Sequence, residues 1–365
     1  MTQRFEDERT ASTTPAATAV DEPGDAEDVV LSVRDLEVVF PTALGDVQAL
    51  NGVTFDVPRG KVLGIVGESG CGKSVTARAI LRIVEKPGRI TGGSITLHKP
   101  TGRAEITKLG SDSEPMRALR GKEIAMIFQE PMSSLNPVHT IGAQIEEAVL
   151  IHQTQDRKEA ADRAVDMLRQ VGMPDPAATA ASYPHQLSGG MRQRAMIAMA
   201  LSCHPTLLIA DEPTTALDVT TEAQILELLR RVRDQAGMSI MFITHSMGVV
   251  AQLCDEVIVM YLGRIVERGS VDGLFHDPRH PYTRALLRSI PRIGGDRTAP
   301  LEVIEGSVPD PYTRVPGCAF HPRCPQALAG RCDTTVPTRT TVTPGHSVHC
   351  HLYETDRTEP TEAAK

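Results

Sequence analysis

The segment GESGCGKS, at residues 67–74, constrains the fold of this 365-residue chain more than any other part of its sequence. It fits the pattern G-x-x-x-x-G-K-[ST], in which glycines let backbone N–H groups turn towards phosphate oxygens. The apolar run KVLGIVG leads into it, and VTARAILRIV, with apolar residues at helical spacing, follows it. A strand, a glycine loop and a helix in this order predict a nucleotide site, with Lys73 on the β- and γ-phosphates and Ser74 on Mg²⁺.

Cys71 lies inside the same loop, close in sequence to Lys73. A thiol beside a lysine can have a lowered pKa and become reactive. We favour the simpler interpretation, in which cysteine is a small side chain that fits a crowded loop.

Outside this loop, short β-rich runs alternate with helical stretches. We expect strands in VVLSVRDLEVVF, GVTFDV, GSITLH, EIAMIFQ, TLLIADEP and SIMFITH. A helical stretch at about residues 135–185 interrupts them, and in it Ala161, Val165, Leu168 and Val171 recur at helical spacing. Continuous apolar strands that alternate with helices are typical of an α/β fold whose parallel sheet is covered on both faces.

Two acidic residues, Asp211 and Glu212, end one of the expected buried strands. A phosphate-binding enzyme needs one carboxylate to hold the Mg²⁺ shell and another to orient the attacking water. An isolated acidic pair is more often a solvated strand end. With the glycine loop upstream, we favour the functional interpretation.

The segment QLSGGMRQR, at residues 186–194, opens a helix with one serine and two glycines. Serine is common at helix N-caps, so a plain capped helix is the simplest explanation. A helix start with bare backbone is also an anion site. A second phosphate-binding surface is useful only if it serves a nucleotide held by another molecule.

The distribution of charged and apolar residues indicates where in the cell the chain is found. No stretch approaches the run of about eighteen apolar residues that a membrane helix needs, and Glu6, Asp7 and Glu8 stand where a signal peptide would be basic and then apolar. We therefore expect a cytoplasmic chain. Residues 1–28 carry eight acids against two bases and lack apolar periodicity, which predicts a disordered acidic tail. The nearly neutral remainder gives no electrostatic reason to expect nucleic acid as a partner.

Six motifs together carry a family resemblance. In chain order, GESGCGKS, FQEP, LSGGMRQR, LLIADEP, TTALD and ITH resemble the Walker A, Q-loop, signature, Walker B, D-loop and H-loop of ABC-transporter ATPase subunits. The resemblance covers about residues 30–270. It implies an α/β P-loop NTPase core of the RecA-like type, with an antiparallel β subdomain and an inserted helical subdomain at about 135–190. We expect the ATPase domain at 29–270 and a C-terminal extension at 271–365.

The resemblance also implies roles for individual residues. Glu212 would be the catalytic base, His245 would contact the γ-phosphate, and Gln129 would lie near Mg²⁺ and the water. Ser74, Gln129 and Asp211 would form the Mg²⁺ shell. The residues expected to contact nucleotide are Phe40, Gly67, Ser69, Gly70, Cys71, Gly72, Lys73, Ser74, Val75, Ser188, Gly189, Gly190, Asp211 and Asp218.

Three of these expected contacts depend on the family's arrangement of two subunits. Ser188 and Gly190 would cap the γ-phosphate of ATP on the opposite subunit, and Asp218 would lie at the interface of the dimer.

Phe40 is the nearest candidate for the aromatic ring that stacks on adenine in the family. Met191 stands where the family most often has glutamine, a departure that leaves the phosphate-facing residues unchanged.

The end of the chain carries a narrower resemblance. GRIVERGSVDGLFHDPRHPYTRALLRSIP and GCAFHPRCP are similar to ATPase subunits of oligopeptide and dipeptide importers, a group that includes nickel uptake systems. This resemblance implies a subunit that powers peptide uptake from the cytoplasmic face of the membrane. Its partners would be an identical or paralogous ATPase, two permease subunits and an extracytoplasmic binding protein.

Two rival functions stay open at this point. A soluble ABC ATPase of DNA repair or of ribosomes would usually carry two cassettes or a long coiled coil, and the sequence has one cassette and no sustained heptads. A non-catalytic regulatory module would not need Glu212 and His245, and both are present.

Four of the seven cysteines fall near the C-terminus with the spacing C-x₅-C-x₇-C-x₁₇-C. A cytoplasmic setting disfavours disulfides, and a short segment with little core can be stabilised by a metal. Four thiolates suit either Zn²⁺ or an iron–sulfur cluster. The resemblance implies a [4Fe–4S] cluster on Cys318, Cys324, Cys332 and Cys350. Zn²⁺ stays the alternative, because His321, His346, His349 and His351 lie in the same stretch.

Overall fold

The computed structural model describes residues 28–130, 134–215, 217–290, 303–310 and 312–354. The predicted acidic tail, apart from Asp28, lies outside these residues. The strands are β1 Val29–Thr42, β2 Gly45–Pro58, β3 Val62–Val66, β4 Arg89–Lys99, β5 Gly102–Glu105, β6 Ile124–Ile127, β7 Leu207–Asp211, β8 Ser239–Thr244, β9 Glu256–Tyr261, β10 Arg264–Ser270, β11 Arg339–Thr343 and β12 His346–His349.

The helices follow the strands in alternation over much of the chain. They are α1 Lys73–Ile80, α2 Glu114–Leu119, α4 Ile141–His152, α5 Arg157–Gln170, α6 Pro176–Ala181, α7 Gly189–Leu201, α8 Val219–Ala236, α9 Met247–Leu253, α10 Val271–His276 and α11 Pro281–Arg288. Short 3-10 turns stand at η1 Ile106–Lys108, η2 Pro184–Gln186, η3 His321–Arg323 and η4 His351–Tyr353.

The central sheet has the strand order β11-β12-β10-β9-β3-β8-β7-β6 among the described residues. Its part from β9 to β6 is parallel. Every residue of β3, β6, β7 and β8 is buried, as expected for apolar strands covered on both faces. The predicted α/β fold with a parallel sheet is confirmed.

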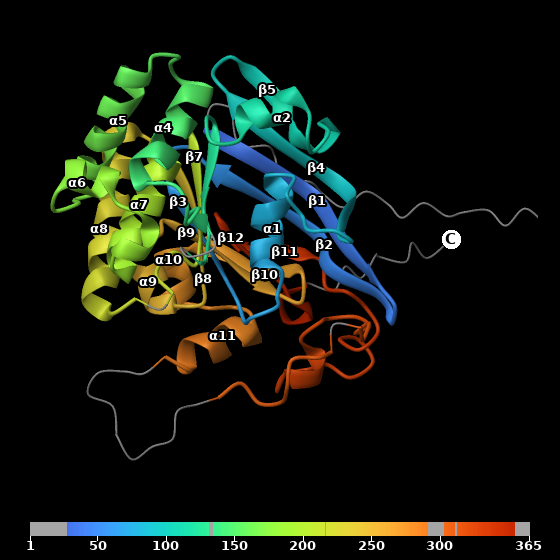
Figure 1. Cartoon of the computed structure of the whole chain (residues 1–365). Helices are drawn as coiled ribbons and strands as arrows, with labels where there is room; N and C mark the ends of the chain where they lie inside the picture. The colour runs from blue at the N-terminus through green and yellow to red at the C-terminus, as the bar shows by residue number, and fades with distance from the viewer. Residues whose placement is uncertain (1–27, 131–133, 216, 291–302, 311, 355–365) are drawn as a thin grey trace, which may run out of the picture.

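A second sheet, in the order β2-β1-β4-β5, is antiparallel and packs over one face of the central sheet. Side chains of this sheet, of α1 and of the central strands form one hydrophobic core. Helices α4 to α8 lie on the opposite side and form another core with the central sheet. Figure 1 shows the two groups as the blue to teal strands and the green to yellow helices that flank the central strands.

Helix α1 is shorter than the sequence pattern predicts. The run of apolar residues continues to Ile83, but the helix ends at Ile80 and Arg82 has a positive φ of 55°. The guanidinium of Arg120 donates to the carbonyl oxygens of Leu81 at 2.9 Å and of Arg82 at 3.2 Å. These bonds satisfy carbonyl groups that a helix end leaves without partners, so the chain turns away there.

The C-terminal region is joined to the central sheet through β12. Strand β12 pairs antiparallel with β10, and β11 pairs with β12. The carboxylate of Glu267 in β10 is fully buried and accepts hydrogen bonds from the backbone of Arg279 (2.6 Å) and His280 (2.8 Å) and from His346 Nε2 (2.7 Å). This one side chain therefore ties β10 to the start of α11 and to β12.

Candidate functional site

The loop Gly67–Ser74 connects β3 to α1, as the sequence predicts. Gly67 has a φ of +155°, and a Cβ at this position would lie 2.2 Å from the carbonyl oxygen of Met260, so only glycine fits. Lys73 is buried, and its Nζ donates to the carbonyl oxygens of Gly67 at 2.8 Å and Glu68 at 3.1 Å. The lysine thus closes the loop on itself, at the place where it would reach phosphate.

The other residues of this loop differ in exposure. Ser69 and Gly70 are exposed at its tip, Gly72 is buried, and Val75 is half-buried in the first turn of α1. Cys71 is buried, and burial raises the pKa of its thiol, although the nearby Lys73 acts in the opposite direction. A thiol with a raised pKa is a poor nucleophile, which supports the interpretation of Cys71 as a small packed residue.

Ser74 and Asp211 meet beside this loop. The Ser74 hydroxyl donates to Asp211 Oδ1 at 3.0 Å, and Asp211 is 3% exposed at the end of β7. Burial raises the pKa of the Asp211 carboxyl; the bond from Ser74 lowers it and the neighbouring Glu212 raises it. A hydroxyl and a carboxylate side by side are the oxygen ligands that Mg²⁺ uses together with phosphates.

Three polar groups hold the carboxylate of Glu212. Gln129 Nε2 and the Thr215 hydroxyl donate to its Oε2 at 3.1 Å and 2.9 Å, and His245 Nδ1 lies 3.3 Å from its Oε1. Glu212 itself has a positive φ of 48°, and its N–H donates to the carbonyl oxygen of Ile243. Backbone in this region is strained for a residue with a side chain and is often found at functional sites.

The residues of this group come from the carboxyl ends of neighbouring parallel strands. Gln129 follows β6, Glu212 follows β7 and His245 follows β8, and these strands are adjacent in the sheet. Ligand sites of open α/β sheets lie at this edge. The structure therefore brings together Lys73, Ser74, Gln129, Asp211, Glu212 and His245, all of them predicted from the sequence.

The serine–glycine turn lies in a second group. Ser188 caps α7 by accepting from the N–H of Met191, and Ser188 and Gly189 are exposed. Gly190 lies against Thr221 at the start of α8, where Asp218 caps the helix by accepting from Thr221. No hydrogen bond in the described part of the chain joins these residues to the Gly67–Ser74 loop. The structure leaves them on the surface of a single chain.

Phe40 lies near the end of β1, with its ring packed against Gly88, and it is half-buried. The sequence predicts no individual role for Thr215, which belongs to the TTALD motif. Its hydroxyl holds Glu212, a role that only the folded turn after β7 reveals.

The four C-terminal cysteines lie in one region of the fold but do not form a group of metal ligands among the described residues. The Cys318 N–H donates to the carbonyl oxygen of Cys332 at 2.8 Å, and Leu328 N–H donates to Cys332 Sγ at 3.3 Å. Burial and, to a smaller extent, the nearby thiols of Cys318, Cys324 and Cys332 raise the pKa of Cys350 to about 11. Among the described residues, no three His, Cys, Asp or Glu side chains are arranged to hold a metal ion. The predicted metal site is therefore not present as a formed group of ligands, and the cysteines are free thiols.

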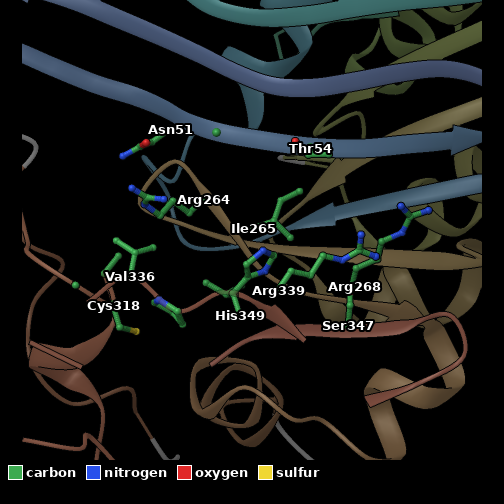
Figure 2. Close-up of a pocket in the computed structure, with 15 residues that line it drawn as sticks. Asn51, Thr54, Arg264, Ile265, Arg268, Cys318, Val336, Arg339, Ser347 and His349 are labelled. Atoms are coloured by element: carbon green, nitrogen blue, oxygen red, sulfur yellow. The ribbon is translucent and has the colours of Figure 1, made fainter. Parts of the chain in front are cut away.

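A small cavity adjoins these cysteines. It has a volume of about 100 Å³ and lies between β2, β10 and the C-terminal region. Figure 2 shows Arg264, Arg268, Arg339 and His349 around it, with Cys318 at one end. Burial lowers the pKa of Arg264, while Glu37 and Cys318 raise it, so the guanidinium is close enough to Cys318 to interact with a thiolate.

Comparison with known proteins gives two family matches. The model for the ABC transporter family matches residues 50–215, and the model for the C-terminal region of oligopeptide/dipeptide transporters matches residues 266–332. Among the described residues, no helix combines the length and hydrophobicity that crossing a membrane requires.

Similar sequences extend over most of the chain. A probable peptide ABC transporter ATP-binding protein of Sinorhizobium fredii is 52% identical over 323 residues, which cover 88% of this chain and 95% of that protein. The dipeptide transport ATP-binding proteins of Bacillus subtilis and Escherichia coli are 47% and 44% identical, over 89% and 91% of this chain and 95% and 99% of theirs.

A solved dimeric bacterial ABC transporter cassette is similar with a TM-score of 0.58 at 25% identity, over 66% of this chain and 98% of its own. These matches agree with the order of the six motifs and with the site at the edge of the central sheet. The chain belongs to the family of ATP-binding proteins of peptide ABC transporters.

Proposed function

We propose that this chain hydrolyses ATP to power the import of peptides. The observation that carries the proposal is the group formed by Gln129, Glu212 and His245 beside Ser74 and Asp211. The printed names of the relatives, which are peptide and dipeptide transport proteins, support peptides as the cargo. The same names weigh against a soluble ATPase of DNA repair or of ribosomes.

In this proposal, residues 29–270 form the ATPase domain, with a helical subdomain at about 135–190, and residues 271–365 form the C-terminal extension. Phosphate binding exchanges the bonds of Lys73 to Gly67 and Glu68 for bonds to the β- and γ-phosphates. The backbone from Ser69 to Val75 cradles the phosphates, and Phe40 stacks on adenine. Ser74, Asp211 and Gln129 would hold Mg²⁺, which supplies neutralisation of phosphate charge when bound.

Glu212 accepts a proton from the attacking water as general base. Gln129 and Thr215 fix the orientation of its carboxylate, since both donate to the same oxygen. His245 is 63% exposed in its side chain and touches Glu212 at 3.3 Å, which leaves its ring free to meet the γ-phosphate. These groups position and deprotonate the water beside the phosphate that Lys73 holds.

The second group of residues acts on a neighbouring subunit's ATP. Ser188, Gly189 and Asp218 are exposed, and they have no hydrogen bond to the Gly67–Ser74 loop of their own chain among the described residues. A similar solved cassette is a dimer, which supports a two-subunit arrangement. The partner would be an identical or a paralogous ATPase.

The complete transporter would also contain two permease subunits and an extracytoplasmic binding protein, with this chain bound at the cytoplasmic face of the membrane. The test uses the complex purified with its permease subunits and reconstituted in liposomes. We expect a dipeptide-loaded binding protein to stimulate ATP hydrolysis, while the free binding protein stimulates it less. Hydrolysis that no peptide-loaded binding protein affects would contradict peptide import and leave the ATPase assignment intact.

We also propose a [4Fe–4S] cluster on Cys318, Cys324, Cys332 and Cys350. The other three thiols lie close enough to Cys350 to raise its pKa, so four thiols of one region supply the required donor set. A single Zn²⁺ with bonds of about 2.3 Å needs its four sulfurs roughly 3.8 Å apart. A cluster spreads the four cysteines over several irons, so wider spacing suits it better. The charge of Arg264 beside Cys318 would favour the thiolate form.

Metal analysis tests this second proposal. Protein purified without oxygen should be brown, absorb near 400 nm and contain about four irons per chain. Colourless protein with one zinc per chain would instead establish the zinc alternative.

A further inference from the structure

Glu68, the second residue of the glycine loop, is held by the C-terminal region. The guanidinium of Arg323 makes two parallel bonds to its carboxylate, from Nη1 to Oε2 at 2.7 Å and from Nη2 to Oε1 at 3.1 Å. The Arg323 side chain is 4% exposed and the Glu68 side chain 25%. Paired bonds of this kind, shielded from water, are among the strongest polar contacts in proteins and fix orientation as well as distance.

Arg323 is itself fixed in place by several contacts. Its Nε donates to the carbonyl oxygen of Glu305 at 3.1 Å, and Nη1 lies 3.4 Å from the hydroxyl of Tyr261. The bond to Glu68 raises the pKa of Arg323 above its ordinary value, so the side chain is always charged. The residue stands in η3, directly before Cys324, so the cysteine-rich segment determines its position.

The backbone of Glu68 is anchored from the same side. Its N–H donates to the hydroxyl of Tyr282 at 2.8 Å, and Tyr282 is fully buried in α11. The ring of Tyr282 packs against those of Tyr261 and Phe320, with centroids 4.7 Å and 5.3 Å apart. The carbonyl oxygen of Glu68 accepts from Lys73. The residue that the C-terminal region holds is therefore also a residue that contacts the phosphate-binding lysine.

We propose that Arg323 is a positioning residue for ATP binding, which makes the C-terminal region a working part of the nucleotide site. It fixes the first half of the glycine loop and neutralises the Glu68 carboxylate. Without it, the side chain of Glu68 would carry an unpaired negative charge in the loop where phosphates bind, on the residue whose carbonyl oxygen Lys73 contacts, and this charge would disfavour phosphate binding. The inference rests on the proposed role of the Gly67–Ser74 loop as the phosphate site.

The test measures the affinity of the purified full-length chain for a fluorescent ATP analogue with Mg²⁺. Arg323→Gln should weaken binding about tenfold, the equivalent of one charge-assisted hydrogen bond. Glu68→Gln removes the pair but also the repelling charge, so its affinity should stay within about threefold of the unaltered chain. In the double variant, Glu68→Gln should recover at least about threefold of the affinity lost in Arg323→Gln.

This recovery separates positioning from general folding. If Arg323 only stabilised the C-terminal region, a second change on the glycine loop would restore nothing. Arg331→Gln is the matched control, since Arg331 belongs to the same region and pairs with Glu354 at 3.1 Å, away from Glu68. Its ATP affinity should equal that of the unaltered chain. If Arg323→Gln does not fold, Arg323→Lys keeps the charge but loses the paired contact, and its affinity should fall about threefold.

Three results would overturn the inference: unchanged affinity in the folded Arg323 variant, no recovery in the double variant, or an equal loss in Arg331→Gln. Lys73→Ala tests the underlying site separately. If Lys73→Ala binds ATP like the unaltered chain, the phosphate loop is assigned wrongly. If it loses binding while the Arg323 variant does not, only the positioning role is wrong.

Discussion

Replacing Glu212 with glutamine is the sharpest test of the catalytic group. The carboxylate accepts two bonds on Oε2, from Gln129 and Thr215, and His245 Nδ1 lies beside Oε1. A glutamine in the same position can accept both bonds on its amide oxygen and can place its amide nitrogen beside Nδ1 of His245. The substitution therefore keeps the size and the contacts of the side chain and removes its basicity.

The expected magnitude follows from this conservation of contacts. Loss of a general base lowers the rate about 10²- to 10⁴-fold, which corresponds to about 3–5 kcal/mol in the barrier. The KM for ATP should change little, because Lys73, Ser74 and Asp211 hold the nucleotide in the proposed site. Thr215→Val, which keeps the carboxylate but removes one bond that orients it, should lower kcat only about tenfold.

Steady-state phosphate release by the purified transporter measures kcat and the KM for ATP. ATP binding to the isolated chain is measured alongside it. The control is Glu227→Gln, the same chemical change on the exposed side of α8, where Glu227 pairs only with Arg230 among the contacts described. Its turnover should equal that of the unaltered complex. Near-normal turnover in Glu212→Gln would refute the role of general base, and loss of ATP binding would show that Glu212 holds the nucleotide instead.

Three further predictions concern other parts of the molecule. Ser188→Arg should abolish hydrolysis in the complex but leave ATP binding to the isolated chain unchanged, because the loop with Lys73 is intact. Fluorescence titration of the isolated chain measures the binding, and a loss of ATP binding there would mean that Ser188 acts on the nucleotide of its own chain. Burial makes the pKa of Asp211 higher in the folded chain than in the unfolded chain. The contribution of Asp211 to the free energy of unfolding is therefore fully present below its unfolded pKa and is lost as the pH rises through its folded pKa. At neutral pH, Asp211→Asn should therefore raise the melting temperature of the nucleotide-free chain and lose the Mg²⁺-dependent stabilisation by ATP, whereas a lowered melting temperature would contradict this reasoning. Glu267→Gln should weaken the attachment of β12 by about 2–4 kcal/mol, because this fully buried carboxylate accepts three hydrogen bonds. Hydrogen exchange at the backbone of His346–His349 should then be faster than in the unaltered chain, and an unchanged exchange rate would contradict this prediction.

Local sequence patterns predict well that Gln129, Glu212 and His245 meet, because each of them stands within two residues of the end of a short apolar strand. The carboxyl ends of adjacent parallel strands meet at one edge, so Gln129, Glu212 and His245 converge once the strand order is right. The roles of these residues stay predictions until they are tested.

Sequence patterns are less informative where two faces of a helix carry similar small and apolar residues. In α5 the sequence pattern puts Ala161, Val165, Leu168 and Val171 at one helical spacing. The structure buries Leu168 and Val171 but leaves Ala161 and Val165 half-buried, and it buries Ala160, Ala164 and Met167 instead. Two overlapping stripes of small and apolar residues fit a helical period equally well, and packing against α4 and α7 decides between them. The polar strands β11 and β12 gave no clear signal either, because β11 is an edge strand with alternating exposed and half-buried residues.

Local sequence patterns do not predict ion pairs between residues that lie far apart in the sequence. Nothing in GESGCGKS or in HPRCP indicates that their glutamate and arginine meet, since each motif is complete within its own segment. The two segments meet through the ring packing of Tyr261, Tyr282 and Phe320 and through the bond from the Glu68 N–H to the Tyr282 hydroxyl.

The ion pair between Glu68 and Arg323 also sets an order of events during synthesis of the chain. Its partners are 255 residues apart, so at about 5–20 residues per second a ribosome takes about 13–50 s to pass from one to the other. Throughout that interval the glycine loop exists without the arginine that neutralises its glutamate. If Arg323 positions the loop as proposed, a chain that ends before Arg323 should bind ATP more weakly than the full-length subunit.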